Sequence, residues 1–86
     1  MYNQDLKKLS FHILIIDDDQ KIRQLLKKFL ENNSFRVSDA ESTQQAKKIM
    51  ETLIFDLLVI DIMMPGQNGL EFLKEIRQTN SIPTLM

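Results

Sequence analysis

The chain has 86 residues, a length suited to one small domain, and its 43% hydrophobic and 27% charged residues are typical of a globular protein and not of a disordered one. Eleven Lys and Arg against twelve Asp and Glu give a net charge of −1, so there is no basic excess to bind nucleic acid or an acidic membrane. The chain has no cysteine and one histidine, which excludes disulfides, cysteine zinc sites and His-rich metal centres.

The first ten residues are polar and lack the apolar core of a signal peptide. No stretch of the sequence approaches the ~20 apolar residues that span a bilayer. We therefore expect an N-terminal polar tail over residues 1–10, one domain over residues 11–86, and a cytoplasmic protein without membrane contacts.

The first predicted strand is the apolar run over residues 11–16, which is interrupted only by His12 and stops at Asp17. A helix is predicted next, with Asp19 placed to cap it and Asn32-Asn33 placed to end it. Its apolar residues recur at helical spacing and form one stripe, with polar residues on the other side, where Lys27 and Lys28 should face solvent. This stripe consists of Ile22, Leu25, Leu26, Phe29 and Leu30.

The remaining elements continue the alternation of strands and helices. The second wholly apolar strand ends on an aspartate, as the first does. In chain order we expect a weak strand over 35–37, a helix from Ser42 or Thr43, an apolar strand over 57–60, a loop over 65–69, a helix lined by Leu70, Leu73 and Ile76, and a strand that starts within 82–86.

This order of elements, with strands that are hydrophobic throughout, predicts an α/β fold: a doubly wound parallel sheet with helices on both faces. Right-handed crossovers leave few topologies, and one of them is the doubly wound arrangement of strand order 2-1-3-4. In that order the first and third strands are neighbours, and the winding direction reverses between them. Ligands of such sheets bind outside the carboxyl ends of the strands at that point.

Three aspartates fall at this predicted switch point. Asp17 and Asp18 close the first strand, and Asp61 closes the third. Taken separately, the first pair also fits an ordinary helix start and Asp61 an ordinary turn. Together, three carboxylates in one shallow cleft repel one another unless a cation neutralises them, and Mg²⁺ with oxygen ligands is the natural partner. A carboxylate beside Mg²⁺ can also act as a nucleophile toward a phosphoryl group.

Two blocks of the sequence resemble the receiver domain of two-component response regulators. They are Ile-Leu-Ile-Ile-Asp-Asp-Asp over 13–19 and Asp-Leu-Leu-Val-Ile-Asp-Ile-Met-Met-Pro-Gly-Gln-Asn-Gly over 56–69. The resemblance implies a flavodoxin-like sheet of order 2-1-3-4-5 and a role in phosphorelay signalling, not an enzyme. The phosphoryl donor would be a phosphohistidine on a sensor histidine kinase or a phosphotransfer protein.

The resemblance also implies roles for individual residues. Asp61 would be the phosphoacceptor, and Asp18 and Asp61 would bind Mg²⁺ directly. Asp17 would act mostly through a bound water, and the backbone carbonyl of Met63 would supply a further ligand oxygen. The Mg²⁺ ion would offset charge that develops during phosphoryl transfer.

The resemblance covers residues 11–86, roughly the first two-thirds of a receiver. The family's later Ser or Thr and Lys have no counterparts, because Thr84 lies too early in its strand. We therefore expect a receiver that is incomplete at its C-terminus and leaves apolar surface and a strand edge uncovered. Such a chain should be marginally stable or should self-associate.

Two alternatives remain at this stage. A truncated, non-signalling remnant would act only as an interaction module. A Mg²⁺-dependent phosphatase with an aspartyl nucleophile would use Asp17 and Asp19, but Lys21 stands where that family has Thr or Val.

Overall fold

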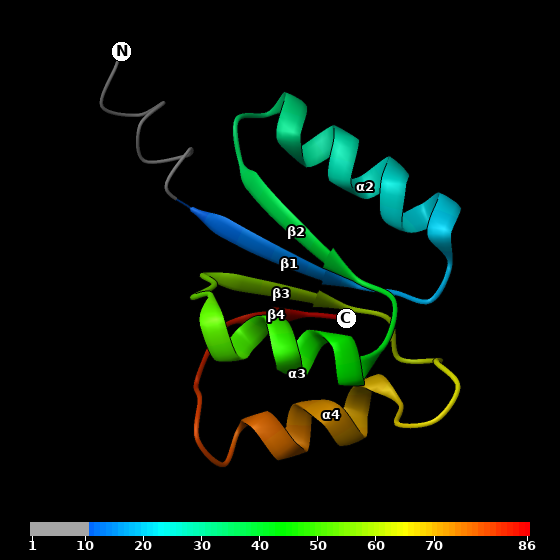
Figure 1. Cartoon of the computed structure of the whole chain (residues 1–86), viewed down its shortest axis with the longest axis vertical. Coiled ribbons are helices and arrows are strands. Elements are labelled where there is room, and N and C mark those ends of the chain that lie inside the picture. Colours follow the sequence, from blue (N-terminus) through cyan, green and yellow to red (C-terminus); the bar gives the residue numbers. More distant parts are fainter. Residues whose placement is uncertain (1–10) are drawn as a thin grey trace.

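The structure, a computed structural model, describes residues 11–86, and the predicted polar tail over 1–10 lies outside them. Strands and helices alternate along the described residues (Figure 1). They are β1 (His12–Ile16), α2 (Gln20–Asn32), β2 (Arg36–Ala40), α3 (Thr43–Thr52), β3 (Leu57–Ile60), α4 (Gly69–Ile76) and β4 (Thr84–Leu85).

The four strands form one parallel sheet in the order β2-β1-β3-β4. Helix α2 covers one face of the sheet, and α3 and α4 cover the other (Figure 1). Ile16 pairs with Ala40 on one side and with Ile60 on the other, so β1, β2 and β3 end level with one another. The predicted doubly wound sheet of order 2-1-3-4 is therefore confirmed, with the switch point between β1 and β3.

Side chains fix the start of each helix. The Asp19 carboxylate accepts hydrogen bonds from the N–H groups of Lys21 and Ile22, which caps α2 as predicted. Ser42 caps α3 in the same way. Asn68 and Glu71 form a reciprocal capping box at the start of α4. These caps stop each helix from extending back into the loop that follows the preceding strand.

The core lies between the sheet and the pair α3 and α4. All five residues of β1 are buried, as expected for a central strand covered on both faces. Leu14, Leu58 and Phe72 have no measurable exposure and belong to the same apolar cluster, which includes Ala46 of α3. Within residues 11–86, no helix is long and apolar enough to cross a membrane.

Only part of the predicted apolar stripe of α2 faces the sheet. Arg23 is buried on the sheet side of this helix, and Leu26 and Leu30 are half-buried there. The other three residues of the predicted stripe are 47%, 69% and 63% exposed: Ile22, Leu25 and Phe29. Arg23 pairs with an acidic residue of β2, and no second helix lies beside α2 in the described part of the chain to cover these three side chains.

His12 and Asp56 lie at the amino ends of the strands, opposite the predicted site. His12 is 8% exposed, its Nε2 is 2.9 Å from Ser38 Oγ, and its ring lies against Phe55. The Asp56 carboxylate accepts a hydrogen bond from the His12 N–H. Both residues therefore join strands and lie away from the acidic cluster.

Candidate functional site

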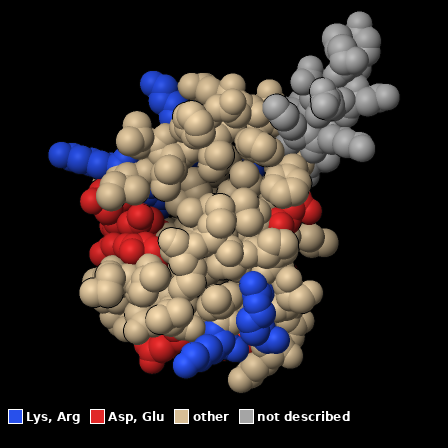
Figure 2. Space-filling model, turned by 180° about the vertical axis from the view of Figure 1, so that it is seen from behind, with Lys and Arg blue, Asp and Glu red and all other residues tan. Residues whose placement is uncertain are grey.

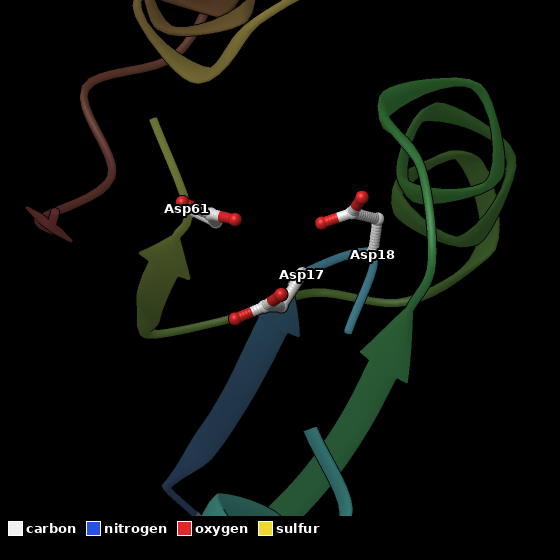
Figure 3. Close-up of side chains that lie close together, drawn as sticks. All are labelled: Asp17, Asp18 and Asp61. Atoms are coloured by element: carbon white, nitrogen blue, oxygen red, sulfur yellow. The ribbon is translucent and has the colours of Figure 1, made fainter. Parts of the chain in front are cut away.

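The three predicted aspartates meet at the carboxyl ends of β1 and β3. Asp17 and Asp18 directly follow β1, and Asp61 directly follows β3. Asp18 and Asp61 extend toward one another, with Asp17 beside them at the end of β1 (Figure 3). One oxygen of each carboxylate lies within 4.8 Å of the others. The structure thus brings together the residues that strand order alone placed at this edge.

The sheet holds the main chain of the two strand-end acids. The N–H of Asp17 donates to the carbonyl of Ala40 at 3.1 Å, and the N–H of Asp61 donates to the carbonyl of Ile16 at 2.9 Å. Each acid therefore extends the hydrogen-bond ladder by one step beyond the strand, which fixes where its side chain starts.

The following residues orient two of the carboxylates. Asp17 Oδ1 accepts a hydrogen bond from the N–H of Asp19 at 2.8 Å, and Asp61 Oδ1 accepts one from the N–H of Met63 at 3.1 Å. Within residues 11–86 the Asp18 carboxylate accepts no hydrogen bond.

The cluster is electrostatically unfavourable without a counter-ion. Burial raises the pKa of the Asp17 carboxyl, and the charges of Asp61, Asp18 and Asp19 raise it further, while the hydrogen bond from the Asp19 N–H acts in the opposite direction. Acidic side chains gather at this edge of the molecule, on the left in Figure 2. A bound cation would remove the repulsion.

The donor set suits a hard divalent cation. All three groups are carboxylates, and none of them forms a salt bridge within the described residues. They run from the buried Asp17 to the exposed Asp18, so the site is open to water on one side. Mg²⁺ binds through one or two carboxylates and keeps several waters, which this arrangement allows.

The loop after β3 is anchored beside Asp61. The N–H of Gly69 donates to the carbonyl of Ile62 at 3.0 Å. A Cβ on Gly69 would lie 2.5 Å from the carbonyl oxygen of Asp61, so only glycine fits. Gly66 has a positive φ of 77°, which glycine adopts without strain. The side chain of Met63 is 82% exposed in this loop.

Sequence reasoning missed a charged group behind the site. Arg23 Nη1 donates to the main-chain carbonyl of Asp17 at 2.9 Å, and Arg23 Nε donates to Asp39 Oδ2 at 2.6 Å. Lys27 also reaches Asp39, at 3.2 Å, so it is not simply a solvated lysine. The signal available in the sequence was the position of Arg23, which shares a helix face with Leu26 and Leu30.

Comparison with known proteins agrees with the fold. The sequence profile of the response regulator receiver domain matches residues 13–86. The chain is 41% identical to the protein PetR of Rhodobacter capsulatus, over 87% of this chain and 32% of that protein. It is 43% identical to the transcriptional regulatory protein CpxR of Escherichia coli K12, over 86% of this chain and 32% of that protein.

A solved structure gives the same result. The response regulator TrrA of Thermotoga maritima, determined in complex with Mg²⁺ and BeF, superposes with a TM-score of 0.77 at 38% identity, over 81% of this chain and 61% of that chain. The chain therefore belongs to the response regulator receiver domain family, and it is a receiver of two-component signalling, a family in which phosphorylation occurs on an aspartate. It spans about a third of the length of the curated relatives that it matches.

Proposed function

We propose that Asp61 is the residue that accepts the phosphoryl group, and that Mg²⁺ bound by Asp18 and Asp61 assists the transfer. Asp17 would take part mainly through a water, and the carbonyl of Met63 would complete the protein's share of the ligands. The observation that supports this best is the convergence of three carboxylates from two neighbouring strands, with oxygens within 4.8 Å of one another. When bound, Mg²⁺ would neutralise charge on the phosphoryl oxygens.

In this reaction Asp61 is the nucleophile, and its neighbours hold its carboxylate in position. A carboxylate oxygen of Asp61 attacks the phosphorus of a phosphohistidine, the P–N bond breaks, and the imidazole leaves with that electron pair. The Met63 N–H, on Asp61 Oδ1, holds the carboxylate so that the other oxygen is free to attack. The product is an acyl phosphate on Asp61.

The donor that fits this chemistry is a sensor histidine kinase or a phosphotransfer protein. A phosphohistidine must approach Asp61 from outside the sheet, and the site is open there because Asp18 and Met63 are both exposed. No nucleic-acid partner is proposed for this chain, in view of its net charge of −1.

Phosphorylation by a small donor tests the proposal. We expect acetyl phosphate with Mg²⁺ to add one phosphoryl group to the chain, measured by intact mass, and EDTA to prevent the addition. Asp61→Asn should abolish it. Asp56→Asn is the matched control, since it changes the same residue type at the other end of β3, and it should leave phosphorylation intact. Equal phosphorylation of Asp61→Asn and wild type would refute the assignment.

The alternative is a module that binds partners without accepting phosphate. It is supported by the exposed apolar side of α2, which carries Leu25 and Phe29; both are more than 60% exposed. Wild-type chain that is folded, binds no Mg²⁺ and takes up no phosphoryl group would favour this alternative over the phosphoacceptor.

A further inference from the structure

A buried arginine lies directly behind the acidic site. Building on the proposed function, we propose that Arg23, oriented by Asp39, is a positioning residue for Mg²⁺ binding. It holds the main-chain carbonyl of Asp17 and thereby sets the direction in which Asp18 presents its carboxylate. Arg23 does not touch the three ligand carboxylates in this arrangement; it acts through the peptide that joins two of them.

Arg23 donates hydrogen bonds from two nitrogens of its guanidinium group. Nη1 donates to the carbonyl of Asp17 at 2.9 Å, and Nε donates to Asp39 at 2.6 Å. The residue is 9% exposed; its hydrogen bond to Asp17 is buried, and the one to Asp39 is partly buried. Two donors in one rigid plane fix the Asp17 carbonyl relative to Asp39 of strand β2, which a single lysine nitrogen cannot do.

Strand β2 in this way holds Asp17 from two sides. Ala40 accepts the hydrogen bond of the Asp17 N–H directly. The preceding residue, Asp39, holds the Asp17 carbonyl through Arg23. Two consecutive residues of one strand therefore determine both main-chain polar groups of the first acid in the site.

The effect reaches Asp18 because the peptide bond is planar. The Asp17 carbonyl and the Asp18 N–H belong to the same rigid unit, so fixing the carbonyl fixes the unit from which Asp18 continues. The Asp18 carboxylate accepts no hydrogen bond of its own within residues 11–86. Its direction toward Asp61 (Figure 3) thus depends on how this peptide is held.

Charge and geometry predict opposite effects when Arg23 is replaced. A cation near a Mg²⁺ site repels the ion, so simple removal of the positive charge should tighten Mg²⁺ binding. Loss of a positioning contact should weaken it, and groups that orient metal ligands typically contribute 10–100-fold to metal affinity. The sign of the change therefore separates the two explanations.

The test is the Mg²⁺ dissociation constant of the whole chain, measured by calorimetry on wild type, Arg23→Gln, Arg23→Lys and Lys27→Gln. We expect both Arg23 variants to bind about tenfold more weakly, although one of them keeps the charge. Lys27→Gln is the matched control, because Lys27 lies one turn further along α2 and contacts Asp39 but not Asp17. It should bind Mg²⁺ as wild type does or more tightly.

A second readout and a second variant cover poor folding of the Arg23 variants. The amide nitrogen of Asp18 should shift in ¹⁵N–¹H spectra of Arg23→Lys but not of Lys27→Gln. If both Arg23 variants fail to fold, Asp39→Asn in the Lys27→Gln background decides. It leaves Arg23 in place without its charged anchor, and because one negative and one positive charge are removed together, net charge does not explain a change. It should weaken Mg²⁺ binding several-fold.

The outcomes distinguish this inference from the proposed function. Folded Arg23→Gln that binds Mg²⁺ as tightly as wild type, or more tightly, would overturn the positioning role and leave the phosphoacceptor assignment standing. For the double variant, unchanged affinity would do the same. Wild-type chain that binds no Mg²⁺ would overturn both.

Discussion

Replacing Gly69 by alanine should disturb Asp61 without altering any charge. The new Cβ would lie 2.5 Å from the carbonyl oxygen of Asp61 and 2.8 Å from Cγ2 of Ile60. Contacts under 3.0 Å are not tolerated, so α4 and the end of β3 must separate by about 0.5 Å or more. Overpacking of this kind costs about 1–3 kcal/mol of the free energy of unfolding.

The same shift should weaken Mg²⁺ binding several-fold, because ligand positions must be held to about 0.5 Å. Urea unfolding followed by far-ultraviolet circular dichroism measures the first effect, and calorimetric Mg²⁺ titration the second. Gly66→Ala is the control: its Cβ would meet nothing within 4 Å, and its φ of +77° costs about 1 kcal/mol by backbone strain alone. Gly66→Ala should therefore lose stability but keep its Mg²⁺ affinity. If Gly69→Ala also kept its Mg²⁺ affinity, the close packing of α4 against the Asp61 main chain would not control the position of Asp61.

Three further predictions concern charge and exposure. Asp18→Asn should raise the free energy of unfolding in the absence of Mg²⁺ by about 1 kcal/mol, because it removes one of three mutually repelling charges. It should also abolish the stabilisation by Mg²⁺ that we expect in thermal melts of the wild type, and an unchanged Mg²⁺ response would contradict its proposed role as a ligand. Since the pKa of Asp17 is raised, the folded chain holds this proton more tightly than the unfolded chain, so stability is lost as the pH rises from the ordinary value of 3.8 through the folded pKa. Urea unfolding over a pH series should show a smaller loss in Asp17→Asn. Identical slopes of the free energy of unfolding against pH in variant and wild type would count against this prediction. Leu25→Gln should change the free energy of unfolding by less than about 0.5 kcal/mol because the side chain is 69% exposed, and sedimentation should show less self-association than wild type if the apolar side of α2 mediates it.

The fold and the acidic cluster were predictable because they depend on simple patterns. Strands that are apolar throughout must be buried on both faces, and carboxyl ends of parallel strands share one edge of the sheet. Asp17 and Asp61 are each the first residue after such a strand, so their proximity followed from strand order. The caps at Asp19 and Ser42 were predictable because they use contacts only two or three residues apart.

Which part of the α2 stripe meets the sheet was not predictable in the same way. The spacing of apolar residues shows that a helix has an apolar side, but not which part of that side meets the sheet. The contact that holds this side of α2 on the sheet joins Arg23 to Asp39, 16 residues apart, and depends on how α2 and β2 are placed relative to each other. A charge pair of this kind can be identified only when both elements are placed in space.

The hydrogen bond between Gly69 and the carbonyl of Ile62 divides the connection after β3 into a narrow neck and an outer arc. The neck shares its fixed position with the sheet and includes Met63, whose N–H is bonded to Asp61 Oδ1, whereas the arc, residues 64–68, has both ends held close together. Surface loops rearrange in nanoseconds to microseconds, while displacing packed elements is far slower. Movement of the arc is thereby separated in time from movement of Asp61. A phosphodonor protein of the proposed kind would therefore meet an adaptable rim around Asp61, and the shape of this rim can change without moving that side chain.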